Sequence, residues 1–212
     1  MLKPKLAAWT LALGFSLSPL AHADMMFENI AQEQHAWAKG YYTLPEAERD
    51  DYFAQLQTHA HDLSSQYPGH AEPLIWEGII TASHAKYQSV FTAGGTAKEA
   101  RDVLLKAIAI NPNAMDGSGL ISLGSLYFKV PRFGSFGDYD KAREYLQRAL
   151  KIDPNNIDAN FFYGEFLLTQ DDKTEAIPYL KKAATAMPRP GREDADKGRH
   201  AEAAELLAKT EQ

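Results

Sequence analysis

The stretch 157–188, IDANFFYGEFLLTQDDKTEAIPYLKKAATAMP, decides the fold of this chain. Counting Ile157 as position 1 puts Gly164 at position 8, Ala176 at 20, Ala183 at 27 and Pro188 at 32. The small residues Gly164 and Ala176 let two paired helices approach closely, and Ala183 sits where a following unit packs. Pro188 ends the second helix, because the residue before a proline avoids the α region. The stretch therefore predicts a hairpin of two helices.

The same spacing recurs along the chain as a ladder of prolines. Pro68, Pro112, Pro154 and Pro188 are 44, 42 and 34 residues apart. An apolar residue stands five positions before each proline, and three of the prolines also have an alanine twelve positions before them: Leu63, Ala107, Ala149 and Ala183, then Ala100, Ala142 and Ala176. A helix hairpin cannot bury its apolar face alone, so such units stack. The ladder predicts an all-α fold, a right-handed α-solenoid of about nine helices.

The solenoid is expected to form one helical domain over residues 24–212. Its repeats fall at approximately 46–72, 73–116, 117–156 and 157–190. Before them, a first helix is expected over Phe27–Lys39, ended by Gly40. After them, an amphipathic helix over 192–210 is expected to cap the last repeat, as repeat arrays need for solubility.

Two insertions interrupt the repeat. The first two proline intervals exceed a 34-residue unit by ten and eight residues, which places insertions at Tyr87–Gly95 and Val130–Gly137. The second insertion carries Phe133 and Phe136 between glycines. Aromatic anchors dominate protein interfaces, so this loop predicts a contact surface. The alternative is a loop tucked back on its own repeat.

Residues 1–23 have the pattern of a secretory signal peptide. Lys3 and Lys5 form a short basic region, Leu6–Leu17 is an apolar run, and the small residues Ala21 and Ala23 predict cleavage before Asp24. The alternative is a membrane anchor, but a spanning helix needs about 20 apolar residues. We expect an exported protein, periplasmic in a Gram-negative source, with no membrane insertion after cleavage.

The composition excludes several classes of function. Without Lys3 and Lys5 the charge is 20 minus 28, or −8, which repels nucleic acid and anionic lipid head groups. The chain has no cysteine, which excludes disulfides, thiolate metal sites and a cysteine nucleophile. It has no nucleophile turn, no metal-binding His spacing and no phosphate-binding loop. We therefore expect neither catalysis nor a cofactor.

The segments 120–154 and 160–188 resemble tetratricopeptide repeat proteins, and the likeness extends over roughly residues 46–188. Three further motifs are similar to the periplasmic T component of TRAP-type solute transporters: a Gly94-Gly95 break before KEAR at 98–101, the insertion VPRFGSFGD at 130–138, and FYGEF at 162–166. The resemblance implies a periplasmic accessory protein that oligomerises and works beside a solute-binding protein.

In hairpins of this type, fixed positions of the first helix line a concave groove. The candidate contacts from the last two repeats are mostly apolar: Ile121, Phe128, Phe161, Glu165 and Leu168. Such a groove suits an apolar ligand or a partner helix. The alternative is that these side chains pack beneath the N-terminal helices. Glu77, Ser125 and Glu165 stand where Lys, Arg and Asn would clamp a terminal carboxylate, so an anionic peptide end is not expected.

The leading function is a non-catalytic protein-interaction scaffold or accessory subunit, associated with a TRAP-type transporter if the resemblance holds. The alternative is a carrier of an apolar small molecule or lipid in the concave groove. A carrier would co-purify with a ligand visible by native mass spectrometry. A scaffold would be ligand-free and would capture a protein partner.

Overall fold

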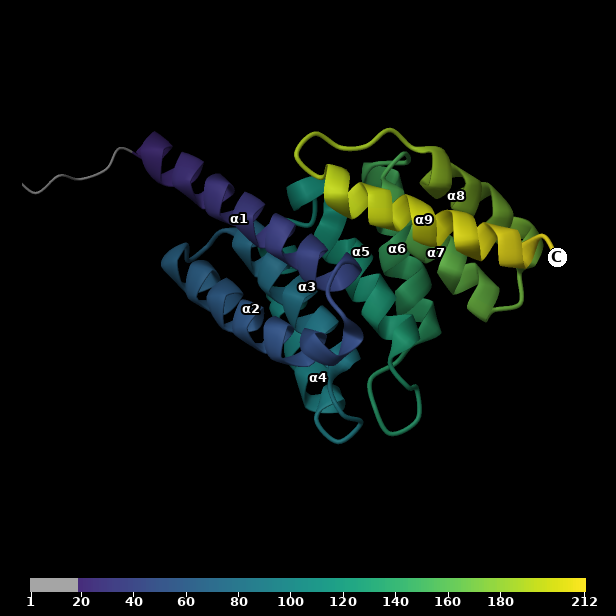
Figure 1. The fold of residues 1–212 in the computed structure, drawn as a ribbon, viewed down its shortest axis with the longest axis horizontal. Helices are drawn as coiled ribbons and strands as arrows, with labels where there is room; N and C mark the ends of the chain where they lie inside the picture. Colours follow the sequence, from purple (N-terminus) through teal and green to yellow (C-terminus); the bar gives the residue numbers. More distant parts are fainter. Residues whose placement is uncertain (1–18) are drawn as a thin grey trace, which may run out of the picture.

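A computed structural model describes residues 19–212, and within that range the chain forms nine α-helices and no β-strand (Figure 1). The helices are α1 (Pro19–Tyr42), α2 (Glu46–Gln66), α3 (Ala71–Tyr87), α4 (Ala93–Ile110), α5 (Ala114–Lys129), α6 (Tyr139–Ile152), α7 (Ile157–Thr169), α8 (Lys173–Thr185) and α9 (Glu193–Thr210). The prediction of an all-α fold is confirmed.

The helices pair into hairpins that stack along the chain. The pairs α3–α4, α5–α6 and α7–α8 pack most extensively, and the first helices form a continuous layer in which α3 contacts α5, α5 contacts α7, and α7 contacts α9. Figure 1 shows α9 lying across the C-terminal hairpins. The expected solenoid of stacked helix hairpins is confirmed.

A glycine lets each hairpin close tightly. A Cβ atom built on Gly78, Gly124 or Gly164 would lie 2.5, 2.7 or 2.8 Å from the facing leucine side chain. Those leucines, and the alanines one turn before them on the same helix, are fully buried: Leu104, Leu146, Leu180, Ala100, Ala142 and Ala176. Only glycine permits this helix separation, so the three hairpins share one packing register.

The first helix closes the array. α1 forms a hairpin with α2 and also contacts α3 and α9, so the N-terminal and C-terminal helices meet (Figure 1). The hydroxyl of Tyr42 donates a hydrogen bond to Glu202 at 3.2 Å. A Cβ atom at Gly198 would lie 2.5 Å from the Tyr42 ring. The contact therefore depends on a glycine in α9 that leaves room for an aromatic ring of α1.

Two predicted helix boundaries are wrong. α1 continues past Gly40 to Tyr42, because Gly40 serves close packing: a Cβ atom there would lie 2.6 Å from the Tyr52 ring. The second error concerns Gly94 and Gly95, which were expected to separate two helices. Both instead lie in the first turn of α4. Neither has a left-handed φ, and nothing lies within 4 Å of a Cβ built at either position, so the helix accommodates both.

The predicted signal peptide falls mostly on residues 1–18, which lie outside the described residues. The described range begins at Pro19, and α1 runs through the predicted cleavage point before Asp24. In residues 19–212 we find no helix with the length and apolar character needed to span a bilayer.

Candidate binding pocket

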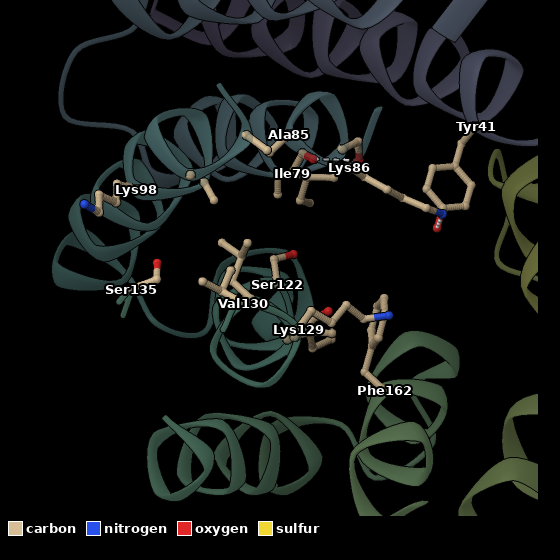
Figure 2. A pocket seen from close by; sticks show the side chains of 18 of the residues that line it. Tyr41, Ile79, Ala85, Lys86, Lys98, Ser122, Lys129, Val130, Ser135 and Phe162 are labelled. Atoms are coloured by element: carbon tan, nitrogen blue, oxygen red, sulfur yellow. Dashed lines mark hydrogen bonds between the residues drawn. The ribbon is translucent and has the colours of Figure 1, made fainter. Parts of the chain in front are cut away.

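A pocket of about 700 Å³ lies between α3 and α5. On one side it is lined by residues of α1 and α7 and by two arginines at and within the N-terminal part of α9. On the other side it meets the first turns of α4 and the loop that follows α5. Figure 2 shows Tyr41 and Phe162 on the first side and Lys98 and Ser135 on the second. Both predicted insertions contribute to its lining, through Val90 and through residues 130–135.

The walls of the pocket are largely apolar. Ile79 of α3 faces it from one wall and Ile121 of α5 from the other. Trp37 of α1 stacks on Tyr41 at 4.9 Å between ring centroids and meets Trp76 edge-on at 6.2 Å. The indole nitrogen of Trp37 also donates a hydrogen bond to Ser83 of α3 at 2.8 Å. These contacts hold α1 against α3 and fix an aromatic wall.

The charged side chains of the pocket are mainly basic. Five of them line it from four parts of the fold: Lys86, Lys98, Lys129, Arg192 and Arg199. Asp158 is the one acidic side chain of the described residues that lines it. Figure 2 shows Lys86 and Lys129 reaching from opposite walls toward the side formed by Tyr41 and Phe162. The pocket is therefore positive, although the whole chain carries a net charge of −6.

Asp158 is neutralised by two arginines. Arg189 and Arg199 each donate a hydrogen bond to its carboxylate, at 2.9 and 2.8 Å. Burial alone raises the pKa of Asp158, but the two guanidinium groups outweigh burial and hold that pKa well below its usual range. This network ties α7 to α9. Within residues 19–212, no group of three His, Cys, Asp or Glu side chains stands close enough to hold a metal ion.

Three cations at the pocket, Lys86, Lys98 and Arg192, have no carboxylate partner in the described part of the chain. The Lys86 amine donates to the Tyr41 hydroxyl at 2.8 Å and forms no ion pair. Arg192 lies over the Trp76 ring at 5.0 Å, and its buried Nε has no hydrogen-bond acceptor. Burial lowers the pKa of Arg192. By contrast, Lys129 is paired with Glu165 at 2.7 Å.

The candidate groove residues divide between the pocket and the core. Ile121 lines the pocket. Glu165 does not line it but binds Lys129, which does. Phe128 is buried against Phe166 of α7, with ring centroids 5.7 Å apart. Phe128 therefore supports the wall without facing the pocket.

The two other candidates lie away from the pocket. Phe161 is covered by the C-terminal helix, with the Arg199 guanidinium 4.4 Å from its ring centroid. Leu168 is half-buried and packs against the core. Of the five groove candidates, Ile121 thus lines the pocket and Glu165 lies at its edge, whereas Phe128, Phe161 and Leu168 do not line it.

Glu77, a groove position expected on α3, is covered by α2. Glu77 accepts hydrogen bonds from Ser64 and His61 of α2, and His84 pairs with Asp50 at 3.0 Å. Glu77 therefore faces the neighbouring helix, and the expectation that it lines the groove is wrong. The register was counted for a helix open on that face, whereas the α1–α2 hairpin occupies it.

The insertion aromatics have different environments. Phe133 is 99% exposed and lies at the pocket mouth. Phe136 is half-buried, packs edge-on against Tyr127 with ring centroids 5.7 Å apart, and has Arg101 4.7 Å from its ring centroid. Phe133 is thus exposed, as a contact surface requires, whereas Phe136 packs back on its own repeat. We call the exposed set Val90, Phe91 and Phe133 the rim; these residues are 87%, 94% and 99% exposed.

Sequence reasoning missed Arg192 and Arg199. Both belong to the C-terminal segment that was interpreted only as a solubility cap. The two arginines are seven residues apart, which is about two turns of a helix. This spacing indicates that both side chains lie on the same face of the C-terminal segment. Lys86 was missed for a different reason, since the repeat register does not place residue 86 among the groove positions.

This arrangement of stacked helix hairpins with a C-terminal helix lying across them is an α-helical repeat fold. Residues 135–191 match the family model described as Tetratricopeptide repeat. The crystal structure of TTC0263, a thermophilic TPR protein from Thermus thermophilus, is similar with a TM-score of 0.55 and 17% identity, covering 88% of this chain and 94% of that one. The prediction of a tetratricopeptide repeat protein is confirmed, and this likeness shows the shared fold.

A second solved structure, MamA AMB-1, gives a TM-score of 0.48 at 17% identity and covers 88% of this chain and 95% of its own. Among curated proteins, no sequence match was found.

Proposed function

We propose that the chain is a non-catalytic scaffold or accessory subunit that binds a protein partner at the rim. The tetratricopeptide fold is one that mediates protein interactions. The main observation in support is the rim. Phe91 and Phe133 belong to two different insertions near the same pocket, and both side chains are almost fully exposed. Exposed clusters of apolar side chains mark interaction sites, and aromatic anchors supply most of their binding energy.

The finer proposal is an exported, periplasmic accessory protein of a TRAP-type solute transporter. Its support is the signal-peptide pattern of residues 1–23 and the three motifs at 94–101, 130–138 and 162–166. The second of these motifs contains Phe133 of the rim, and the first begins three residues after Phe91. On this proposal, the partner is the solute-binding protein of the transporter.

Crosslinking from the rim tests the partner. A photoreactive phenylalanine analogue at Phe133 should form an adduct with one protein in intact cells, identified by mass spectrometry. Replacing Phe91 and Phe133 by serine should reduce partner capture at least about tenfold, as expected for interface anchors. The matched control is Met187→Ser, an apolar side chain that is 87% exposed in the loop before α9. Equal capture by the rim variant and the control would overturn the proposal.

A second candidate function is a carrier of a small molecule. The observation that favours it is the pocket of about 700 Å³, whose size lies within the range typical of ligand sites. Native mass spectrometry of the gently purified protein separates the two functions. A carrier retains a bound ligand, whereas a scaffold shows only the mass of the polypeptide.

A further inference from the structure

We infer that the pocket binds a small amphipathic anion, with a carboxylate-like head group at Arg192 and Lys86 and an apolar body between α3 and α5. The inference deepens the carrier function and names the chemical class of its ligand. It does not depend on the rim or on the protein partner.

Of the three neighbouring arginines Arg189, Arg192 and Arg199, Arg192 is the one that forms no ion pair with a described residue. The nearest acids, Asp158 and Asp196, already form ion pairs with Arg189, and Asp158 also binds Arg199. Arg192 is left with only the Trp76 ring as a partner. A partly buried guanidinium without a counter-ion is costly, and an anion that forms charge-assisted hydrogen bonds with it relieves that cost.

The unfilled hydrogen-bonding groups of the pocket are mostly donors. Nε of Arg192 and the indole nitrogen of Trp76 have no acceptor but are covered by the chain itself, so the donors of Arg192 that a ligand can reach are its terminal guanidinium nitrogens. The Lys86 amine, which can donate three hydrogen bonds, makes one, to Tyr41. An ionised carboxylate offers only acceptors, so its chemistry complements this set. A neutral alcohol or a cation of the same size does not.

The remainder of the ligand must be apolar. Ala82 and Ile79 face the pocket from α3, while Ile121 and Leu126 face it from α5. An extended peptide would bring backbone amide groups between these walls, and buried amides need hydrogen-bond partners. The described lining has no Asn or Gln side chain, and two of its five serines, Ser83 and Ser118, already use their hydroxyls within the chain. A small molecule with one charged end therefore fits better than a peptide.

Ligand titration tests the class directly. The probes are dodecanoate, dodecanol and dodecyltrimethylammonium, which share an alkyl chain and differ in head-group charge. Trp37 and Trp76, two of the three tryptophans of the chain, line the pocket, so binding should change tryptophan fluorescence. Calorimetry gives the affinities independently. Dodecanoate should bind at least about tenfold more tightly than either other probe, the ratio expected for a hydrogen bond to a charged group.

Variants locate the head group. Arg192→Gln and Lys86→Gln should each weaken dodecanoate binding several-fold or more while leaving dodecanol binding unchanged. Lys86 is exposed, so its variant remains informative if Arg192→Gln impairs folding. The matched control is Arg148→Gln, a partly exposed arginine of α6 paired with Glu144 and outside the pocket. Ser122→Phe, which places a ring between the walls, should abolish binding of both probes.

Three results would overturn the inference: no dodecanoate binding, equal affinity for dodecanol, or a Lys86→Gln variant that binds like Arg148→Gln. These results are independent of the scaffold proposal. Crosslinking at Phe133 without dodecanoate binding rejects the anion and keeps the partner. Dodecanoate binding without a crosslink at Phe133 supports the anion site and rejects the protein partner at the rim.

Discussion

Replacing Gly164 by alanine tests the packing register of the hairpins. The added methyl group would lie 2.8 Å from Cγ and Cδ2 of Leu180, whereas carbon atoms in favourable contact are about 3.5–4.0 Å apart. Forcing an extra methyl group into a packed core costs about 1–3 kcal/mol. Alanine in place of glycine inside a helix gains about 1 kcal/mol. The net effect should be a loss of up to about 2 kcal/mol.

A second glycine isolates the packing cost. Gly95 also lies in a helix, but nothing is within 4 Å of a Cβ atom built there. Gly95→Ala should therefore stabilise the protein by up to about 1 kcal/mol, through helix propensity alone. The free energies of unfolding of the two variants, from urea denaturation, should differ by about 1–3 kcal/mol, the cost of overpacking. Equal stability would refute the proposed role of Gly164.

The partner of Gly164 gives a further check. In a Leu180→Ala background the new methyl group enters space that the leucine has vacated, so Gly164→Ala should stabilise that variant by up to about 1 kcal/mol. If the cost of Gly164→Ala persists in this background, the obstacle is not Leu180. The Ala176 carbonyl oxygen, 3.4 Å from the built Cβ atom, would then be the opposing atom.

Three other predictions concern stability, measured by urea denaturation. Asp158→Asn should cost about 1.5–3 kcal/mol, because it removes the carboxylate that binds both Arg189 and Arg199, while these arginines keep Asp196 and Glu202 as partners. A loss below about 1 kcal/mol contradicts this. Burial raises the pKa of Glu33 to about 7, against a smaller lowering by a nearby histidine, so the folded protein keeps a proton that the unfolded chain releases. Stability should thus fall as the pH rises from about 4.5 to 7, by roughly 1–2 kcal/mol after allowance for partial exposure, and Glu33→Gln should remove this dependence. Phe136→Ala should lower the free energy of unfolding by about 2 kcal/mol, because Phe136 packs against its repeat. Phe133→Ala should lower it by less than about 0.5 kcal/mol, because Phe133 is exposed. Similar losses for both variants would contradict these different environments.

The hairpin register could be predicted because it depends on residue size at fixed spacing. Gly164, Ala176 and Pro188 are each required by local geometry, and the structure places the first two where the helices touch. The groove residues were harder to predict. α5 and α7 are buried on most of their surface, so an apolar pattern does not distinguish a pocket-facing residue such as Ile121 from a core residue such as Phe128.

The basic end of the pocket could not be predicted from local pattern. It forms because the residue just before α9, Arg192, lies over Trp76 of α3, and the two residues are far apart in the sequence. No repeat rule specifies that contact, since it depends on individual fits such as the Tyr42 ring against Gly198. The insertions, in contrast, were visible as departures from the repeat length, and both contribute to the pocket mouth.

The meeting of α1 and α9 has a consequence for how the protein unfolds. In an open repeat array each unit contacts only its neighbours, so the terminal units fray first and melting spreads inward. Here a hydrogen bond joins residues 160 positions apart, and each end of the array covers the other. Both ends should then exchange their amide hydrogens at similar rates, and the protein should lose its structure in a single cooperative transition. A change in the first helix would accordingly be felt at the last, although most of the chain lies between them.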